Sequence, residues 1–264
     1  MTMPHSAVHP IAALSDNYIW LIRQGDRAAV VDPGEASPVL AWLHAHGVAL
    51  DAILLTHHHG DHVGGVLELV ERYGCPVWGP ARERLPHCDH PVGEGSRVQL
   101  PHLGIYLQVL DVPGHTAGHV AYVGKVPGNP LALFSGDTLF AGGCGRLLEG
   151  TPTQMYDSIG KFSSLPLETS IFCGHEYTLA NLRWAKSVEG DNGALQETFL
   201  AAEAARAAGR PTLPSTIGQE SATNPFMRTH LAQVAKAASQ WAGHALDGPV
   251  DVFAALRAWK NDYK

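Results

Sequence analysis

Short apolar runs that end at a glycine, a proline or a polar cluster recur along the chain as far as residue 176. Runs of this length between turn-forming residues are typical of β-strands. The runs Asn17–Arg23 and Ala28–Gly34 predict a hairpin that turns at the sequence QGDR. Helical spacing over Val39–Gly47 and Val63–Gly74 separates further runs, so the pattern predicts an α/β fold. The other strands are expected at 51–57, 76–80, 105–114, 119–124, 131–137 and 169–176.

The composition changes after Thr178, where alanine-rich segments with high helix propensity replace the strand pattern. Helices are expected there at 179–188, 194–209, 228–243 and 250–263, with a proline-rich connection at 210–225. An earlier helix is expected to have Thr151 as its N-cap and Pro152 at its first position. We therefore predict a β-rich α/β domain over residues 1–174 and a helical domain over residues 175–264.

Composition excludes several classes of protein. No apolar run reaches the roughly 20 residues that a membrane helix needs, and the first residues lack the pattern of a secretion or mitochondrial leader. The formal net charge of −7 argues against a nucleic-acid surface. The four cysteines have no CxxC spacing, so they are expected to be thiols and not a disulfide framework. We expect a monomer in the cytoplasm with no membrane or nucleic-acid partner.

The segment THHHGDHVGG at Thr56–Gly65 follows an apolar run that ends at Leu55. Open sheets place their ligand sites in such loops, at the carboxyl ends of strands. If the segment stays partly extended, His57 and His59 project to one side, and His58 points away. Two histidines on one side of a loop at a strand end are candidates for metal ligands.

A turn at the permissive Gly60 can bring Asp61 and His62 to a second point. That arrangement suits two metal ions better than one. A polar turn or a hydrogen-bonded histidine cluster remains the alternative for this segment taken alone.

Three later segments repeat the pattern of an apolar run, a glycine and a candidate ligand. His115 follows one run and a proline–glycine turn, Asp137 follows a second run, and His175 follows a third. All three could therefore converge with the first segment at one sheet edge. Imidazole and carboxylate ligands suit zinc, and also iron or manganese.

Together these segments resemble the metallo-β-lactamase superfamily, and the resemblance rests on THHHGDH, GHTAGH, GDTLF and GHEYT. The stretches GGCGRLLEGT, HEYTLANLRWA and NPFMR are similar to those of the glyoxalase II, or hydroxyacylglutathione hydrolase, family. The resemblance covers nearly the whole chain. It implies a four-layer αββα sandwich followed by a helical domain that binds glutathione.

The resemblance also implies a site with two divalent metal ions, most simply zinc, with iron or manganese as alternatives. One ion would be held by three histidines and the other by an aspartate and two histidines, with a second aspartate as the bridge. In that order the residues are His57, His59 and His115, then Asp61, His62 and His175, then Asp137.

The implied reaction is hydrolysis of S-D-lactoylglutathione to D-lactate and glutathione, as in methylglyoxal detoxification. Asp61 and Asp137 would be the catalytic carboxylates, acting with a metal-bound hydroxide. No cysteine nucleophile is then needed, so Cys144 and Cys173 are expected to be packing residues. An iron-dependent persulfide dioxygenase, or another hydrolase on this fold, is the alternative function.

Substrate binding would involve four residues that match the family pattern: Arg146, Tyr177, Arg257 and Lys260. The family often has an aromatic residue where this chain has Leu148, which puts one peptide contact in doubt. By spacing alone, Arg257 and Lys260 could equally form a solvated helix face.

Asp32 ends a strand and could either hydrogen-bond a ligand histidine or stabilise its own turn.

Overall fold

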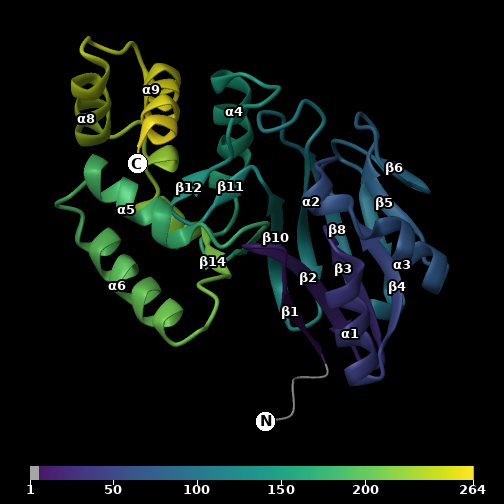
Figure 1. Ribbon diagram of the computed structural model, residues 1–264. Coiled ribbons are helices and arrows are strands. Elements are labelled where there is room, and N and C mark those ends of the chain that lie inside the picture. The colour runs from purple at the N-terminus through teal and green to yellow at the C-terminus, as the bar shows by residue number, and fades with distance from the viewer. Residues whose placement is uncertain (1–5, 264) are drawn as a thin grey trace. The chain divides into compact units, whose positions relative to one another are not determined.

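The computed structural model describes residues 6–263, and Figure 1 labels those of its elements for which there is room. The chain forms two compact units that alternate along the sequence. The first unit comprises the chain up to Asp111 together with residues 117–136 and 170–175. The second comprises residues 112–116, 137–169 and 176 onwards, so it includes short segments that the sequence assigned to the first domain.

The first unit contains most of the strands. Its elements are β1 (Ser6–Ala13), β2 (Asn17–Gln24), β3 (Arg27–Val31), α1 (Ala36–His46), β4 (Ala49–Leu54), α2 (Gly60–Val63), α3 (Val66–Tyr73), β5 (Val77–Pro80), β6 (His90–Val92), β7 (Arg97–Leu100), η1 (Pro101–Leu103), β8 (Ile105–Asp111), β9 (Val120–Val126), β10 (Asn129–Gly136) and β13 (Ser170–Cys173).

One sheet of this unit has the strand order β1-β2-β3-β4-β5-β6. The first three strands are antiparallel, and β3, β4, β5 and β6 run parallel. Gln24 pairs with Arg27, which confirms the hairpin predicted at QGDR. The sequence did not reveal β1, which is an edge strand and therefore tolerates Pro10 within it.

Helices α1 and α3 pack on this sheet, and Figure 1 shows them together beside β3 and β4. Their buried side chains, among them Val39, Leu43 and Leu69, belong to one apolar cluster with strand residues such as Leu21 and Ile53. Both helices end at a glycine in the left-handed conformation, as the sequence predicted for each. Burying these apolar faces stabilises the unit by roughly 1.5–3 kcal/mol for each fully buried large side chain.

The predicted helix over Val63–Gly74 is broken into α2 and α3 at Gly64 and Gly65. A Cβ added at Gly65 would lie 2.5 Å from the backbone nitrogen of Ala36, and one at Gly64 would lie 2.5 Å from the carbonyl oxygen of Gly34. The two glycines therefore let this segment lie directly against the backbone that follows β3. This close approach places the loop after β4 beside the carboxyl end of β3.

The other sheet of the first unit has the order β13-β10-β9-β8-β7, with β10 and β13 parallel. The loops that follow β4 and β13 hold the predicted ligands His57–His62 and His175. The α/β class predicted from the sequence is confirmed by these mixed sheets with their helices.

The second unit is mainly helical. Its elements are β11 (Leu139–Phe140), β12 (Gly143–Cys144), α4 (Pro152–Ser163), α5 (Thr178–Val188), α6 (Gly193–Ala207), β14 (Ser215–Thr216), α7 (Ile217–Thr223), η2 (Pro225–Met227), α8 (Ala232–Ala242) and α9 (Pro249–Asp262). Trp184, Phe226 and Phe253 form its aromatic core, with ring centroids 5.1 Å apart in each successive pair. Across residues 6–263, no helix is both long and apolar enough to cross a bilayer.

Helices α4 and α7 of this unit begin at threonine N-caps. Thr151 caps α4 in a capping box with Gln154, as the sequence predicted for Thr151. The proline-rich connection predicted over residues 210–225 contains a helix that the sequence analysis did not predict, because α7 begins there at the N-cap Thr216. The hydroxyl oxygen of Thr216 accepts a hydrogen bond from the backbone N–H of Gln219. The Thr-x-x-Gln pattern was therefore an available signal for this helix.

Candidate metal centre

The loop after β4 presents His57 and His59 to each other. His57 is fully buried, and its Nε2 lies 3.1 Å from Nδ1 of His59. Two imidazole nitrogens this close can share one metal ion or one proton. His58, between them, directs its Nδ1 to a carboxylate oxygen of Glu83 at 2.8 Å, in agreement with the expectation that it points away.

A second cluster in the first unit consists of Asp61, His62 and His175. One carboxylate oxygen of Asp61 lies 3.5 Å from Nε2 of His62 and 3.4 Å from Nε2 of His175. The side-chain amide of Asn17 donates a hydrogen bond to that same oxygen at 3.0 Å. Potential ligand atoms of these three residues lie within 4.8 Å of one another, which is compatible with one shared cation.

Three of the predicted ligand rings of this unit are oriented through their Nδ1 atoms. Nδ1 of His62 lies 3.0 Å from Asp32, and Nδ1 of His175 lies 2.8 Å from Asp16. Nδ1 of His57 lies 3.0 Å from the hydroxyl oxygen of Thr56. A donor bond from Nδ1 fixes the neutral tautomer whose Nε2 carries the lone pair. These contacts therefore leave Nε2 of these three rings available to a metal ion.

Asp32 holds two parts of this arrangement together. It accepts hydrogen bonds from the backbone N–H of Thr56 at 2.8 Å and from the Thr56 hydroxyl at 2.7 Å, besides its contact with His62. Its backbone is left-handed, with φ of 52°. Asp32 therefore hydrogen-bonds the predicted ligand His62, the first of the two roles that the sequence left open, and its other side-chain contacts are with Thr56, 24 residues away.

The second unit contains the other two predicted ligands, His115 and Asp137. Nε2 of His115 lies 3.5 Å from a carboxylate oxygen of Asp137. Nδ1 of His115 lies 2.9 Å from the backbone carbonyl oxygen of Arg146, so this ring too is oriented through Nδ1. Each unit thus provides nitrogen and oxygen ligands of the type that zinc, iron and manganese accept.

The four predicted substrate-binding residues all lie in the second unit, in different surroundings. Arg146 is exposed, and Tyr177 is 37 % exposed with its ring edge-to-face on Phe140. Arg257 is buried, and Lys260 is half-buried. Leu148, at the position where the family often has an aromatic residue, is exposed.

Arg257 hydrogen-bonds to the polypeptide that precedes Arg146. One of its terminal nitrogens donates to the carbonyl oxygen of Cys144 at 2.7 Å, and the other donates to Asn261 at 3.0 Å. Lys260 donates to the carbonyl oxygen of Ala180 at 3.3 Å. Burial, with a smaller effect of the nearby Arg257 charge, lowers the pKa of Lys260 to about 8. Neither cation is part of a solvated helix face, which was the alternative from spacing alone.

The two cysteines near the predicted ligands are buried. Burial raises the pKa of Cys144 to about 11, so its thiol is protonated at neutral pH. Cys173 directs its sulfur to the carbonyl oxygen of His175 at 3.7 Å. Cys144 therefore behaves as a packing residue, because only a thiolate is a strong nucleophile, and Cys173 is fully buried.

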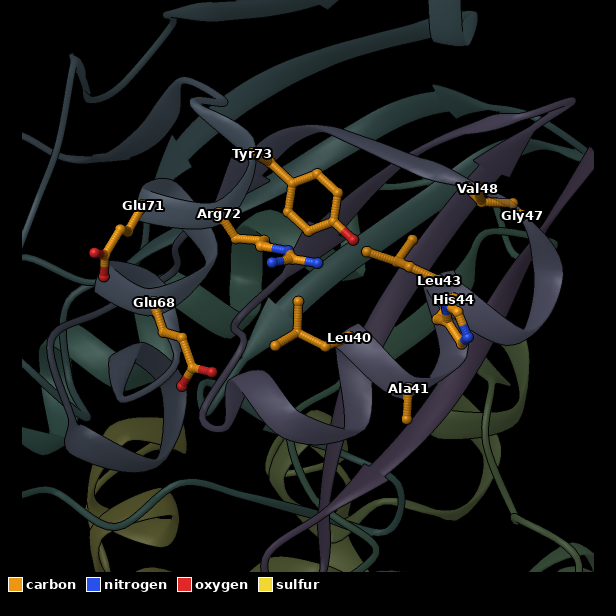
Figure 2. A pocket seen from close by; sticks show the side chains of 10 residues that line it. All are labelled: Leu40, Ala41, Leu43, His44, Gly47, Val48, Glu68, Glu71, Arg72 and Tyr73. Carbon is orange, nitrogen blue, oxygen red and sulfur yellow. The ribbon is translucent and has the colours of Figure 1, made fainter.

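A surface groove between α1 and α3, drawn in Figure 2, is separate from these residues. Apolar side chains such as Leu40 and Leu43 line it beside the charged residues Glu68, Glu71 and Arg72. None of the predicted ligands or substrate-binding residues lies in its wall. The groove therefore takes no part in the chemistry of the histidine clusters.

The mixed sheets and the histidine–aspartate clusters define the class of protein. The family model described as metallo-beta-lactamase superfamily matches residues 14–175, which contain every predicted metal ligand. A di-iron-bound form of the protein TTHA1623 is 30% identical with a TM-score of 0.57, over 83% of this chain and 100% of that one.

Relatives that are similar along their whole length show which family within this superfamily the chain resembles. A hydroxyacylglutathione hydrolase of Alkalilimnicola ehrlichii is 57% identical over 95% of this chain and 97% of its own. One of Halorhodospira halophila is 51% identical over 97% of this chain and 99% of its own. The model described as hydroxyacylglutathione hydrolase C-terminus matches residues 176–263. The chain belongs to the hydroxyacylglutathione hydrolase family of metal-dependent hydrolases within the metallo-β-lactamase superfamily.

Proposed function

We propose that the chain hydrolyses acylglutathione thioesters, with S-D-lactoylglutathione as the main substrate and D-lactate and glutathione as the products. The observation that carries the proposal is the similarity to hydroxyacylglutathione hydrolases along the whole chain, helical tail included. In this reaction the oxygen of water bonds to the acyl carbon and the carbon–sulfur bond breaks. The sulfur leaves with the bonding electrons as a thiolate, which needs no strong general acid.

Two divalent metal ions would complete the site. His57, His59 and His115 would hold one ion, Asp61, His62 and His175 the other, and Asp137 would bridge them. The oxygen and nitrogen donor set in each unit supports this assignment. When bound, such ions lower the pKa of water and polarise an acyl oxygen. Zinc is the simplest occupant, and the di-iron form of a similar protein supports iron as well.

The chain's own residues prepare this chemistry. Asp32, Asp16, Thr56 and the carbonyl of Arg146 keep the Nδ1 atoms of four rings engaged, so the Nε2 lone pairs would be available to the ions. Rings whose Nδ1 atoms are engaged in this way would lose little orientational freedom on binding an ion. The buried thiol of Cys144 stays protonated, so no acyl-enzyme forms on it.

Glutathione carries two carboxylates and several amides, and cationic side chains of the second unit would bind them. Lys260 and Arg146 would supply positive charge, and Tyr177 a hydroxyl group and an aromatic face. Arg257 would act indirectly, by supporting this surface, because its guanidinium is buried against the carbonyl of Cys144. We further propose that the protein acts as a monomer in the cytoplasm.

Release of free thiol from S-D-lactoylglutathione, followed on protein of known metal content, tests the function. We expect metal-dependent thiol release, with D-lactate formed in equal amount. Glutathione persulfide under an oxygen electrode is the second arm of the experiment. If the protein consumes oxygen with glutathione persulfide and releases no thiol from the thioester, the hydrolase proposal is rejected in favour of a dioxygenase.

A further inference from the structure

A tight hairpin in the second unit lies between the predicted ligand Asp137 and the predicted substrate residue Arg146. Strands β11 and β12 pair antiparallel, with Phe140 opposite Gly143, so Ala141 and Gly142 form the turn. Gly142 has φ of +69°, a conformation that favours glycine. The whole hairpin is buried. Its backbone groups therefore need partners from the surrounding protein.

Glu220 on α7 supplies one of these partners. Its side chain is fully buried, and one carboxylate oxygen accepts hydrogen bonds from the backbone N–H of Gly142 at 2.7 Å and from Asn224 at 2.9 Å. The other oxygen accepts from the hydroxyl of Ser215 at 2.5 Å. All three neighbours donate, and no cation is among them. A buried carboxylate without a cation is costly unless its oxygens are hydrogen-bonded, so these three donors are what hold Glu220 against the hairpin.

Asn224 makes further hydrogen bonds to the hairpin. Its side-chain amide nitrogen donates to the carbonyl oxygens of Gly143 at 3.0 Å and Phe140 at 3.2 Å. Its side-chain oxygen accepts from the backbone N–H of Phe226. Asn224 is fully buried, and with Glu220 it holds the N–H and C=O groups on both strands of the turn.

The hairpin leads directly to the predicted active-site residues. Two residues after Gly143, the N–H of Gly145 donates to the carbonyl of Thr138 at 3.2 Å. The next carbonyl, that of Arg146, lies 2.9 Å from Nδ1 of His115. A shift of the hairpin would therefore move both the Arg146 side chain and the group that orients His115.

We propose that Glu220 and Asn224 are positioning residues for the hydrolysis, acting through the β11–β12 hairpin on Arg146 and His115. The catalytic part of this inference rests on the proposed function. The structural part, that the pair holds the Arg146 carbonyl against the His115 ring, stands independently. The direct partner of His115 is the Arg146 carbonyl, and loss of a direct partner of a metal-binding histidine typically costs about tenfold to a hundredfold in metal affinity or activity.

The test compares Glu220→Ala, Glu220→Gln and a matched control, Glu189→Gln. In Glu220→Gln the amide oxygen can still accept from Gly142, while its NH₂ can donate to the Ser215 hydroxyl. Glu189 is another buried carboxylate of the second unit, but its partner is Arg228 and it has no bond to the hairpin. The control therefore reports the cost of neutralising a buried carboxylate in the same unit.

Two readouts are measured on each variant. Proton–nitrogen NMR of the histidine rings in metal-free protein, assigned with His115→Gln, reports the Nδ1–H of His115 without any activity. Steady-state kinetics on the metal-loaded protein report kcat and KM for the glutathione thioester. We expect Glu220→Ala to lose the His115 signal and about tenfold to a hundredfold in kcat/KM. We expect Glu220→Gln to recover most of both, and Glu189→Gln to change neither.

The proposal is overturned if Glu220→Ala keeps the His115 signal, or if Glu220→Gln recovers nothing. It is also overturned if Glu189→Gln lowers kcat/KM as much as Glu220→Ala does. Should Glu220→Ala not fold, Glu220→Asp decides, because it keeps the charge but shortens the reach to Gly142. An unchanged His115 ring and unchanged kinetics in that variant would then reject the role. Wild-type protein without thioesterase activity would reject the proposed function alone, since the NMR readout would still test the positioning.

Discussion

Replacing Asp32 by asparagine should weaken the predicted metal site without unfolding the protein. The left-handed backbone at residue 32 tolerates asparagine, whereas alanine there would add about 1–2 kcal/mol of strain. Asparagine keeps one acceptor oxygen for the N–H of Thr56 but presents an NH₂ group to Nδ1 of His62. The ring must then reverse its tautomer, and its metal-binding nitrogen acquires a proton.

The magnitude follows from the contacts that are lost. A hydrogen bond to a charged acceptor is worth about 1.5–3 kcal/mol, and Asp32 is buried, so water cannot replace it. We expect the free energy of unfolding of metal-free Asp32→Asn to fall by about 1.5–3 kcal/mol. Metal affinity and kcat/KM should each fall about tenfold to a hundredfold, as for other partners of metal-binding histidines.

Urea unfolding of the metal-free protein, elemental analysis after dialysis and thiol-release kinetics measure these quantities. Asp16→Asn is the matched comparison, because Asp16 contacts His175 in the same way but has a side chain that is 37% exposed. Water can replace that partner, so its losses should be smaller. Asp32→Asn with metal content and kcat/KM within twofold of wild type would refute the reasoning.

Four further outcomes are expected. Asp137→Ala should lower the metal content toward one ion or fewer per chain, while His58→Ala, whose ring faces Glu83, should leave it unchanged in elemental analysis. Cys144→Ser should keep most activity and show no burst of thiol release, because the pKa of about 11 leaves the native thiol protonated. Lys260→Ala should raise KM and spare kcat, whereas Arg257→Ala, which also releases the Cys144 carbonyl, should lower kcat as well. The pKa of Lys260 lies below its ordinary value of 10.5, so its charge is present below about pH 8 and lost above it. The KM of wild type should therefore rise from pH 7 to pH 9. An equal rise of KM in Lys260→Ala would contradict this.

The sequence predicted most of what local chemistry determines. Apolar runs gave the strands, and glycine placed the ends of α1 and α3 at Gly47 and Gly74. The histidine loop after β4 was predicted because a run of ligand-type residues directly follows an apolar run. The ligand pattern did predict that His175 lies beside Asp61, but distant contacts that involve no such pattern were not predictable. The break between α2 and α3 depends on a close approach to the backbone at Gly34 and Ala36, which no local pattern encodes.

Contacts between distant residues also escaped prediction in the second unit. Spacing placed Arg257 and Lys260 on one helix face but could not show whether that face contacts solvent or the rest of the protein. The partner of Arg257 is the carbonyl of Cys144, 113 residues away. Glu220 was missed because its helix lies in a proline-rich stretch, although the capping pattern at Thr216 was visible. Its role depends on a contact with Gly142, 78 residues away, for which the sequence gives no signal.

The contacts around His175 have a consequence for how the protein acquires metal while it is being made. Asp16, which orients the His175 ring, precedes it by 159 residues, and Asn17 bonds to Asp61 while forming a β-bridge with His175. In a chain that grows from its N-terminus, His57 and His59 emerge early, but the Asp61–His62–His175 cluster cannot exist until β13 has joined the sheet. Such a distant contact forms late, since a long loop must close first. Binding of a cation to this cluster would therefore mark completion of the first unit.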